Sequence, residues 1–170
     1  MSLIILEGAD GNGKTTLLKQ LERDTNLPVF YSGGPKTPEI MLNMLYDLEQ
    51  MALDEKVFLC DRVPFVSEIV YSAALQREPV IDPIALMEYW KLPIQIIYCR
   101  LSDPSEALKN MSREFKAHKP FEHTKEVELK HERITEMYDQ IMDEAEKDGI
   151  NIFEYDWKNP EHYAQLMEWL

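Results

Sequence analysis

The sequence predicts a three-layer α/β fold in which helices flank a five-stranded, mostly parallel sheet. Short apolar runs alternate with longer amphipathic segments along the chain, a pattern typical of strands joined by helical crossovers. The runs are almost continuously apolar, as expected of parallel strands that are covered on both faces. Because no repeat, low-complexity stretch or linker interrupts the 170 residues, we expect a single domain, 1–170.

Each element is predicted from its own residues. The strands are short runs of mostly apolar residues, and we expect them at 3–6, 28–31, 56–60, 94–99 and 150–155. The helices are expected in the amphipathic segments between them, at 14–23, 38–51, 65–76, 83–90, 104–116, 126–147 and 160–170. Prolines stand near the start of several of these segments, where the first turn of a helix accepts them.

Composition narrows the classes of partner. The net charge is −13, from 31 acidic and 18 basic side chains, so the surface repels anionic membranes and long nucleic acids but leaves room for a small anionic substrate. The two cysteines, Cys60 and Cys99, stand in apolar runs and are expected to be reduced core residues. No signal peptide or membrane-spanning run is found in the sequence, so we expect a cytoplasmic protein.

The stretch GADGNGKT, at 8–15, matches the phosphate-binding pattern G-x-x-x-x-G-K-[ST] between a predicted strand and a predicted helix. Its glycines allow the backbone amides to surround phosphate oxygens, and the start of the helix adds a positive dipole end. A nucleoside triphosphate is therefore expected to contact Gly8, Ala9, Asp10, Gly11, Asn12, Gly13, Lys14, Thr15 and Thr16. In this P-loop NTPase-type arrangement, Lys14 reaches the β- and γ-phosphates and Thr15 binds Mg²⁺. The alternative is a glycine-rich turn that binds nothing.

Two opposite charges, Asp61 and Arg62, follow the predicted strand at 56–60. The carboxyl ends of parallel strands meet at one edge of the sheet, so this pair is expected beside the P-loop. A carboxylate there can organise Mg²⁺, and the planar guanidinium matches a phosphate. Phe65 and Tyr71 on the next helix are candidates for contact with the substrate, although Phe65 fits the core equally well. The alternative for Asp61 and Arg62 is a surface ion pair.

Three stretches resemble the thymidylate kinase family of P-loop nucleotide kinases. ILEGADGNGKTTLLKQL is similar to the family's opening, including Glu7 before the first glycine and Asp10 within the loop. DRVPFVSEIVY resembles its D-R-Y-x-x-S-x-x-A-Y stretch with one extra residue. PFEHTKEVELKHERITEMY, at 120–138, resembles its F-E pair and the long helix that follows. A weaker resemblance links YSGGP and the Asp-Arg stretch to kinase-like proteins of bacteriophages.

This resemblance implies roles for several residues. Asp10 would approach the sugar 3′-hydroxyl of a deoxynucleotide, and Arg62 would bind the phosphate of the acceptor. Family members without an arginine in the P-loop supply one from a mobile lid, which corresponds to about 104–125 here. We expect Arg113 to be that residue, because a bidentate cation suits the charge on a transferring phosphoryl group. A solvated basic helix face is the alternative. The family is often dimeric, so a homodimer is a further expectation.

The sequence departs from the family after the second predicted strand. The family usually has R-E-P-G-G there, whereas this chain has YSGGPKTP, so Lys36 is the candidate to replace the missing arginine and thymidylate need not be the acceptor. Of the lesser candidates, His118, His123 and His131 fit no zinc spacing and are expected on the lid surface. Trp157 follows the last strand, where the family binds adenine; a plain loop is equally consistent with the sequence.

The function expected from these features is transfer of the γ-phosphoryl group of ATP, with Mg²⁺, to a (deoxy)nucleoside monophosphate, a step of nucleotide biosynthesis. A deoxynucleoside kinase is the nearest alternative, and it would need a carboxylate base such as Glu7 or Asp61. A 5′-hydroxyl polynucleotide kinase is disfavoured by the acidic surface. An ATP-binding switch module with little turnover is the alternative outside the enzymes. For a phage protein, the compartment would be the host cytoplasm.

Overall fold

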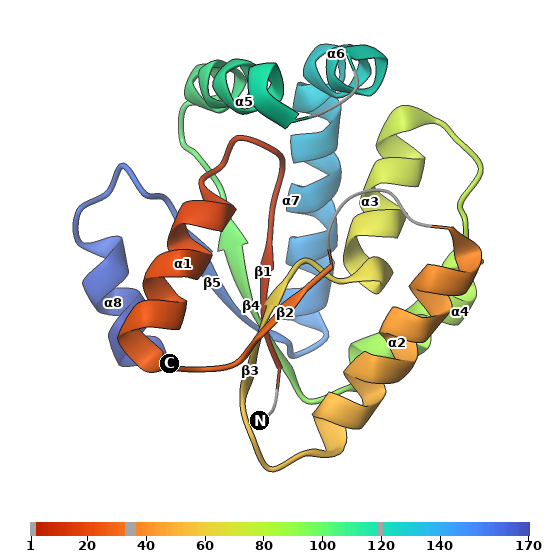
Figure 1. The fold of residues 1–170 in the computed structure, drawn as a ribbon, viewed down its shortest axis with the longest axis vertical. Helices are drawn as coiled ribbons and strands as arrows, with labels where there is room; N and C mark the ends of the chain where they lie inside the picture. The colour runs from red at the N-terminus through yellow and green to blue at the C-terminus, as the bar shows by residue number, and fades with distance from the viewer. Residues whose placement is uncertain (1–2, 33–36, 119–120) are drawn as a thin grey trace.

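The computed structural model describes residues 3–32, 37–118 and 121–170, with the side chains of 112–124 outside the description. Five parallel strands form one sheet in the order β2-β3-β1-β4-β5, as Figure 1 shows. The strands are β1 (Leu3–Glu7), β2 (Val29–Tyr31), β3 (Phe58–Asp61), β4 (Ile94–Cys99) and β5 (Asn151–Tyr155). The predicted fold class is confirmed, and every strand pair in the sheet is parallel.

The order of the strands places the P-loop in the middle of the sheet. β1 is the central strand, paired with β3 on one side and β4 on the other. In the register of the sheet, Leu6 of β1 lies opposite Asp61 at the end of β3. The glycine-rich loop and the Asp-Arg pair therefore leave the sheet side by side at the same edge.

Helices cover both faces of the sheet. They are α1 (Lys14–Thr25), α2 (Pro38–Leu53), α3 (Pro64–Leu75), α4 (Pro83–Met87), α5 (Pro104–His118), α6 (Phe121–Leu129), α7 (His131–Lys147) and α8 (His162–Trp169), with a short 3₁₀ helix, η1 (Glu88–Lys91). Successive residues of β1 point to opposite faces: Ile5 belongs to the core under α2, α3 and α7, and Leu6 to the core under α1 and α8. Figure 1 shows α1 and α8 on one side of the sheet and α2 and α3 on the other.

Local sequence explains how several helices begin. Proline occupies the first turn of α2, α3 and α4, where a missing backbone N–H costs nothing. The side chain of Thr37 accepts a hydrogen bond from the backbone of Ile40 at the start of α2. The Asp82 side chain accepts one from the backbone of Ile84 at the start of α4.

Two helix predictions differ from the structure. The segment expected as one helix, 126–147, is divided between α6 and α7 at Lys130, whose φ of −107° and ψ of 12° are not helical. The Lys130 side chain instead donates a hydrogen bond to the carbonyl oxygen of Leu75 on α3. The segment expected at 83–90 ends as α4 at Met87 and continues as the 3₁₀ helix. The periodicity of apolar residues does not indicate a one-residue break within a helical segment.

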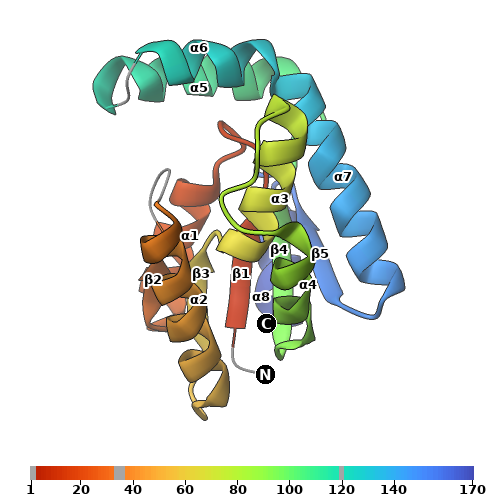
Figure 2. The same ribbon diagram turned by 90° about the vertical axis from the view of Figure 1, so that its right-hand side faces the viewer.

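Helices α5 and α6 lie across one end of the molecule, above the edge at which the P-loop leaves the sheet (Figure 2). Of the segment proposed from the sequence as a lid, 104–125, the described residues 104–118 and 121–125 belong to these two helices. Among the helices of the described residues, none is long and apolar enough to cross a bilayer.

Candidate active site

The P-loop joins β1 to α1, and its carbonyl groups are held by side chains from distant elements. Asn110 of α5 donates its amide N–H to the carbonyl oxygen of Gly11 at 3.0 Å, and Nε2 of His131 donates to the carbonyl oxygen of Asp10 at 3.0 Å. Within the loop, the amide of Asn12 donates to the carbonyl oxygen of Cys99 at 2.9 Å. Contacts with α5, α7 and β4 therefore hold the conformation of the loop.

His131 does not lie on the lid surface, as predicted from the sequence, but is buried at the start of α7. Its burial lowers the pKa of the imidazole. The sequence could not indicate this contact, because 121 positions separate His131 from Asp10. The other two histidines of that prediction, His118 and His123, lie outside the described side chains.

Gly11 is required at its position by both conformation and space. Its φ is +82°, and a Cβ built there would lie 2.2 Å from the carbonyl oxygen of Ala107 in α5. We expect Gly11→Ala to lower the free energy of unfolding by about 2–4 kcal/mol, from left-handed strain plus overpacking.

Gly149→Ala is the matched control in a denaturant unfolding experiment. Gly149 has a φ of +91°, but a Cβ added there would meet nothing within 4 Å, so only the conformational part of the cost remains, about 1–2 kcal/mol. Equal losses for the two variants would show that α5 does not pack on the P-loop as described.

Lys14 is buried at the start of α1, and its ammonium group is turned back onto the loop. Nζ donates to the carbonyl oxygens of Gly8 and Ala9, each at 2.7 Å. Removal from water lowers the pKa of Lys14 to about 8. Thr15 and Thr16 are exposed and, with Lys19, Gln20 and Arg23, line a cavity of about 430 Å³ along α1. The loop thus presents one desolvated cation and an open helix terminus, a combination suited to phosphate.

Arg62 lies beside the P-loop, as the register of the sheet requires. Nη2 donates to Oδ1 of Asp10 at 2.7 Å and to the carbonyl oxygen of Gly8 at 3.1 Å, and Nη1 donates to the hydroxyl of Tyr71 at 2.9 Å. The side chains of Arg62 and Asp10 are only 17% and 19% exposed. The structure therefore brings together three residues that were predicted separately for the acceptor site.

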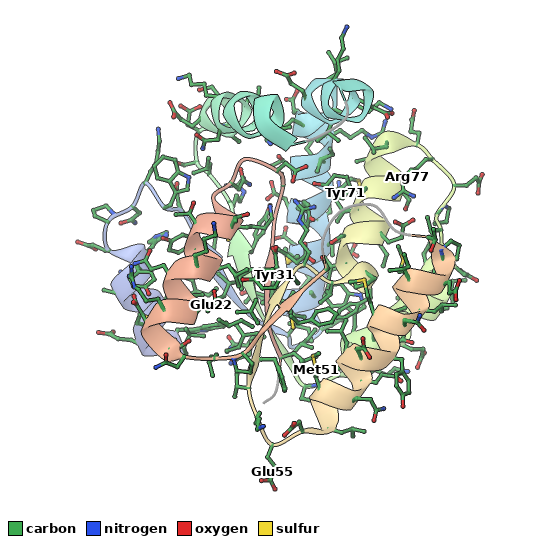
Figure 3. The ribbon with its side chains drawn as sticks, in the orientation of Figure 1. Glu22, Tyr31, Met51, Glu55, Tyr71 and Arg77 are labelled. Atoms are coloured by element: carbon green, nitrogen blue, oxygen red, sulfur yellow. The ribbon has the colours of Figure 1, made fainter. Side chains whose placement is uncertain are left out.

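The backbone of Arg62 is unusual, because its φ of +63° lies in the left-handed region. This conformation costs a residue other than glycine about 1–2 kcal/mol. Asp61, immediately before it, is half-buried at the end of β3. Tyr71 lies on α3 on the side facing α7 (Figure 3), with its ring edge-on to that of Tyr138.

Phe65 was a candidate for contact with a nucleotide base, but the structure places it in the core. Its side chain is fully buried. The ring stacks on Tyr89 and meets Trp90 edge to face, with centroid distances of 6.0 Å and 5.7 Å. The first turn of α3 points Phe65 toward η1, so the core interpretation replaces the base-stacking one. Lys36 and the side chain of Arg113 lie outside the described residues; the backbone of Arg113 belongs to α5.

Trp157 packs against the P-loop. From the sequence, its segment was equally consistent with a base-binding role and with a plain loop. A Cβ on Gly13 would lie 2.8 Å from Cδ1 of the indole. The residue is 41% exposed. Nζ of Lys158 lies 5.8 Å from the centre of the ring. A partly exposed aromatic side chain thus lies next to the phosphate-binding loop.

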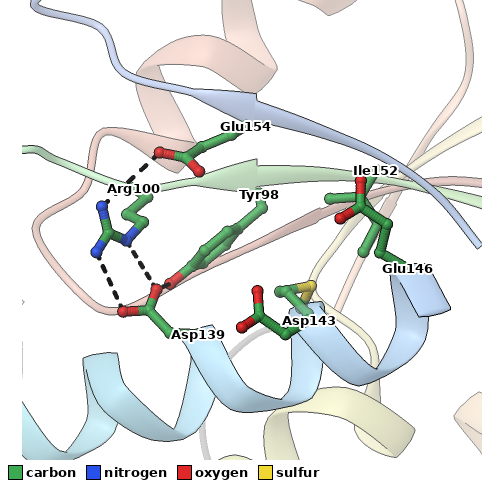
Figure 4. Close-up of a pocket in the computed structure, with 8 residues that line it drawn as sticks. Tyr98, Arg100, Asp139, Asp143, Glu146, Ile152 and Glu154 are labelled. Carbon is green, nitrogen blue, oxygen red and sulfur yellow. Dashed lines mark hydrogen bonds and ion pairs between the residues drawn. The ribbon is translucent and has the colours of Figure 1, made fainter.

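A second cavity, of about 390 Å³, lies between α7 and strands β4 and β5 (Figure 4). Its lining includes Asp139, Asp143, Glu146 and Glu154, with Arg100 as the cation. Arg100 is already paired with Asp139 at 2.7 Å. Such a surplus of carboxylates repels phosphate, so this cavity is not a second nucleotide site.

No family model and no curated protein sequence matches the chain. Solved structures match it over almost its whole length. The YorR protein of Bacillus subtilis, in complex with phosphorylated GDP, is 18% identical with a TM-score of 0.62, covering 99% of this chain and 94% of its own. Deoxyadenosine kinase of M. mycoides, with dCMP and dCDP bound, is 14% identical with a TM-score of 0.65, covering 98% and 96%.

A third match is the thymidylate kinase of Candida albicans, which is 16% identical with a TM-score of 0.62 and covers 98% of this chain and 89% of its own. The fold is therefore that of the P-loop nucleotide kinases. Within that class, the matches include a thymidylate kinase, in agreement with the resemblance of the three sequence stretches.

Proposed function

We propose that the protein transfers the γ-phosphoryl group of ATP to a nucleoside monophosphate and produces the diphosphate. The observation that carries the proposal is the position of Arg62: its guanidinium lies 3.1 Å from the carbonyl oxygen of Gly8, at the mouth of the P-loop. A phosphate bound by Arg62 would be adjacent to the phosphates of a triphosphate in the loop. The P-loop kinase fold of the chain supports the same reaction class.

The donor side of the proposed site is the P-loop, 8–16. Its amides and Lys14 would neutralise the triphosphate. Thr15 and Asp61 supply the hard oxygen ligands that Mg²⁺ prefers, and Mg²⁺ commonly uses one or two protein groups with phosphate and water completing its shell. Among the described residues, no cluster of three or more acidic, histidine or cysteine side chains suits a metal, so such an ion would depend on the nucleotide. When bound, Mg²⁺ would offset charge on the β- and γ-phosphates.

The acceptor side is built around Arg62 and Asp10. Binding of an acceptor phosphate would draw the guanidinium from the Asp10 carboxylate, and that carboxylate would then accept a hydrogen bond from a sugar hydroxyl. Tyr71 holds the other arm of Arg62. Arg113 remains the candidate for the transition-state cation from the lid, and Lys36 for additional contact with the acceptor.

A deoxynucleoside kinase is the second candidate, because a deoxyadenosine kinase is among the structural matches. A hydroxyl acceptor needs a general base within reach. Glu7 does not suit that task, because it is fully buried and both carboxylate oxygens accept hydrogen bonds from protein donors. Asp61 is the remaining carboxylate from the sequence prediction. A phosphate acceptor needs no strong base, and this favours the monophosphate.

Replacement of Trp157 by alanine should weaken ATP binding. An adenine stacked on this ring would contribute about 1–3 kcal/mol, the range found for base–aromatic stacking. We expect the KM for ATP to rise about tenfold, with the acceptor KM unchanged. Trp157→Phe keeps an aromatic face and is the matched control. An unchanged KM for ATP in Trp157→Ala would remove this loop from the donor site.

The function is tested by ADP release from ATP and Mg²⁺ across a panel of ribo- and deoxynucleoside monophosphates and nucleosides, with an acceptor-free reaction as the blank. Turnover with one or a few monophosphates is the expected result and identifies the acceptor. Turnover only with nucleosides would replace the proposal by the nucleoside kinase. Tight ATP binding without turnover of any acceptor would favour a switch module.

A further inference from the structure

Glu7 is a buried acid that the proposed reaction does not use. It ends β1, directly before the P-loop, and its side chain is fully buried. Oε1 accepts hydrogen bonds from the backbone N–H of Val63 at 2.8 Å and the hydroxyl of Ser67 at 3.2 Å. Oε2 accepts one from the hydroxyl of Tyr138 at 2.9 Å. A carboxylate that is fully buried and accepts three hydrogen bonds is held in place by the protein rather than by water. Glu7 therefore has a structural task.

The Val63 contact fixes the peptide that follows Arg62. The Arg62 backbone is in the left-handed region, which a non-glycine residue keeps only when its surroundings hold it there. Its own N–H donates to the carbonyl oxygen of Leu6 at 3.1 Å. The next N–H, of Val63, donates to Glu7. Both peptides of the turn are therefore anchored to the end of β1, one through a backbone oxygen and one through the Glu7 carboxylate.

The direction of the Arg62 side chain depends on this turn. If residue 62 relaxed to negative φ, its Cα–Cβ bond would swing, and the guanidinium would leave the positions from which it reaches Asp10 and the carbonyl oxygen of Gly8. Several ionisable groups face Glu7: Arg62 from the turn, Lys14 from α1, Tyr138 from α7 and the thiol of Cys60 from β3. Burial raises the pKa of Glu7, and Arg62 opposes that shift.

We propose that Glu7 is a positioning residue, whose carboxylate oxygen holds the left-handed turn at Arg62 and thereby directs the guanidinium at the acceptor phosphate. This inference deepens the proposed function and rests on it for the identity of the acceptor. It assigns Glu7 no contact with substrate and no proton transfer. The property that matters is an acceptor oxygen at the distance of the glutamate side chain, rather than negative charge alone.

Two conservative variants of Glu7 separate the effect of side-chain length from the effect of negative charge. Glu7→Asp keeps the charge but withdraws the carboxylate from Val63 by one methylene; Glu7→Gln keeps an oxygen at that distance and removes the charge. We expect Glu7→Asp to raise the acceptor KM about tenfold, with the KM for ATP within about twofold, because a hydrogen bond to a buried donor is lost. Glu7→Gln should stay within about twofold of wild type in both constants.

Tyr138→Phe is the matched control, because it removes a hydrogen bond to Glu7 from Oε2 and leaves the Val63 contact in place. Its acceptor KM should be within about twofold of wild type. A greater loss in Glu7→Gln than in Glu7→Asp would overturn the proposal in favour of an electrostatic role. Equal increases in both substrates' KM values would also overturn it, since they would indicate general disturbance of the loop.

A crystal structure of Glu7→Asp gives a readout that needs no activity. The expected result is departure of residue 62 from φ near +63° and loss of the 2.7 Å contact between Arg62 and Asp10. An unchanged turn in this variant would overturn the positioning role even if the protein is a kinase. A displaced turn, together with a wild-type protein that phosphorylates no monophosphate, would support the role of Glu7 and contradict only the proposed function.

Discussion

Replacing Arg62 by alanine is expected to lower kcat/KM for the acceptor by 10²-fold or more, roughly the effect of truncating a partly buried charged partner at about 2–5 kcal/mol. The physical reason is the fork of donors that Arg62 now divides between Asp10, Gly8 and Tyr71. Without it, an acceptor phosphate would lose its guanidinium partner and would still face the Asp10 carboxylate. The measurement is steady-state ADP release with the acceptor and ATP varied in turn.

Arg62→Lys is the informative companion to this variant. Lysine keeps the positive charge but has no planar fork, so it cannot hold Tyr71 and a phosphate from one position. We expect a loss intermediate between wild type and alanine, with the KM for ATP nearly unchanged. Equal loss of ATP and acceptor binding in Arg62→Ala would contradict an acceptor site at this residue and indicate that Arg62 supports the P-loop itself.

Much of the fold was predictable because it depends on short-range patterns. Continuous apolar runs indicated the buried strands, and the glycine-rich motif located the turn between β1 and α1. The strand-edge rule for parallel sheets correctly put Arg62 next to Asp10, 52 positions away. That rule needs only the order of elements, which the sequence displays.

The contacts that support the site were not predictable in the same way. His131 and Asn110 hold adjacent carbonyl groups of the P-loop from α7 and α5. In the sequence, each looks the same as a polar residue on the solvent-exposed face of a helix. At the break between α6 and α7, the Lys130 side chain likewise donates to the carbonyl oxygen of Leu75 on another helix, a contact that no local pattern indicates. Phe65 shows the converse: an aromatic next to a functional motif was placed by packing against Tyr89 and Trp90.

Replacing Lys14 by methionine is expected to reduce turnover by about 10²–10³-fold, comparable with the loss of one preorganised donor to a developing charge. Methionine preserves much of the length and the apolar stem of the side chain, so the change isolates the ammonium group. The conformation of the loop should change little in this variant, because the hydrogen bonds of Asn12, Asn110 and His131 remain. The loss of turnover would then report on the missing ammonium group. Retained turnover would contradict the donor site.

The pH dependence of ATP binding tests the same residue without mutating it. Burial lowers the pKa of Lys14 to about 8 from its ordinary value of 10.5. Below pH 8 the ligand-free protein already carries the ammonium ion, whereas above it ATP binding must take up a proton. The affinity for ATP should therefore fall by up to about tenfold per pH unit between about pH 8 and the pKa of the ATP-bound form.

The same shift has the opposite effect on the free protein. Between about pH 8 and 10.5 the unfolded chain keeps a proton that folded Lys14 has lost, so this residue makes the ligand-free protein more stable as the pH rises.

Calorimetric titration of ATP in buffers of different ionisation enthalpy measures directly the uptake of a proton on ATP binding. Lys14→Met should abolish that uptake. A flat ATP affinity across this range would contradict the uptake of a proton by Lys14 on ATP binding.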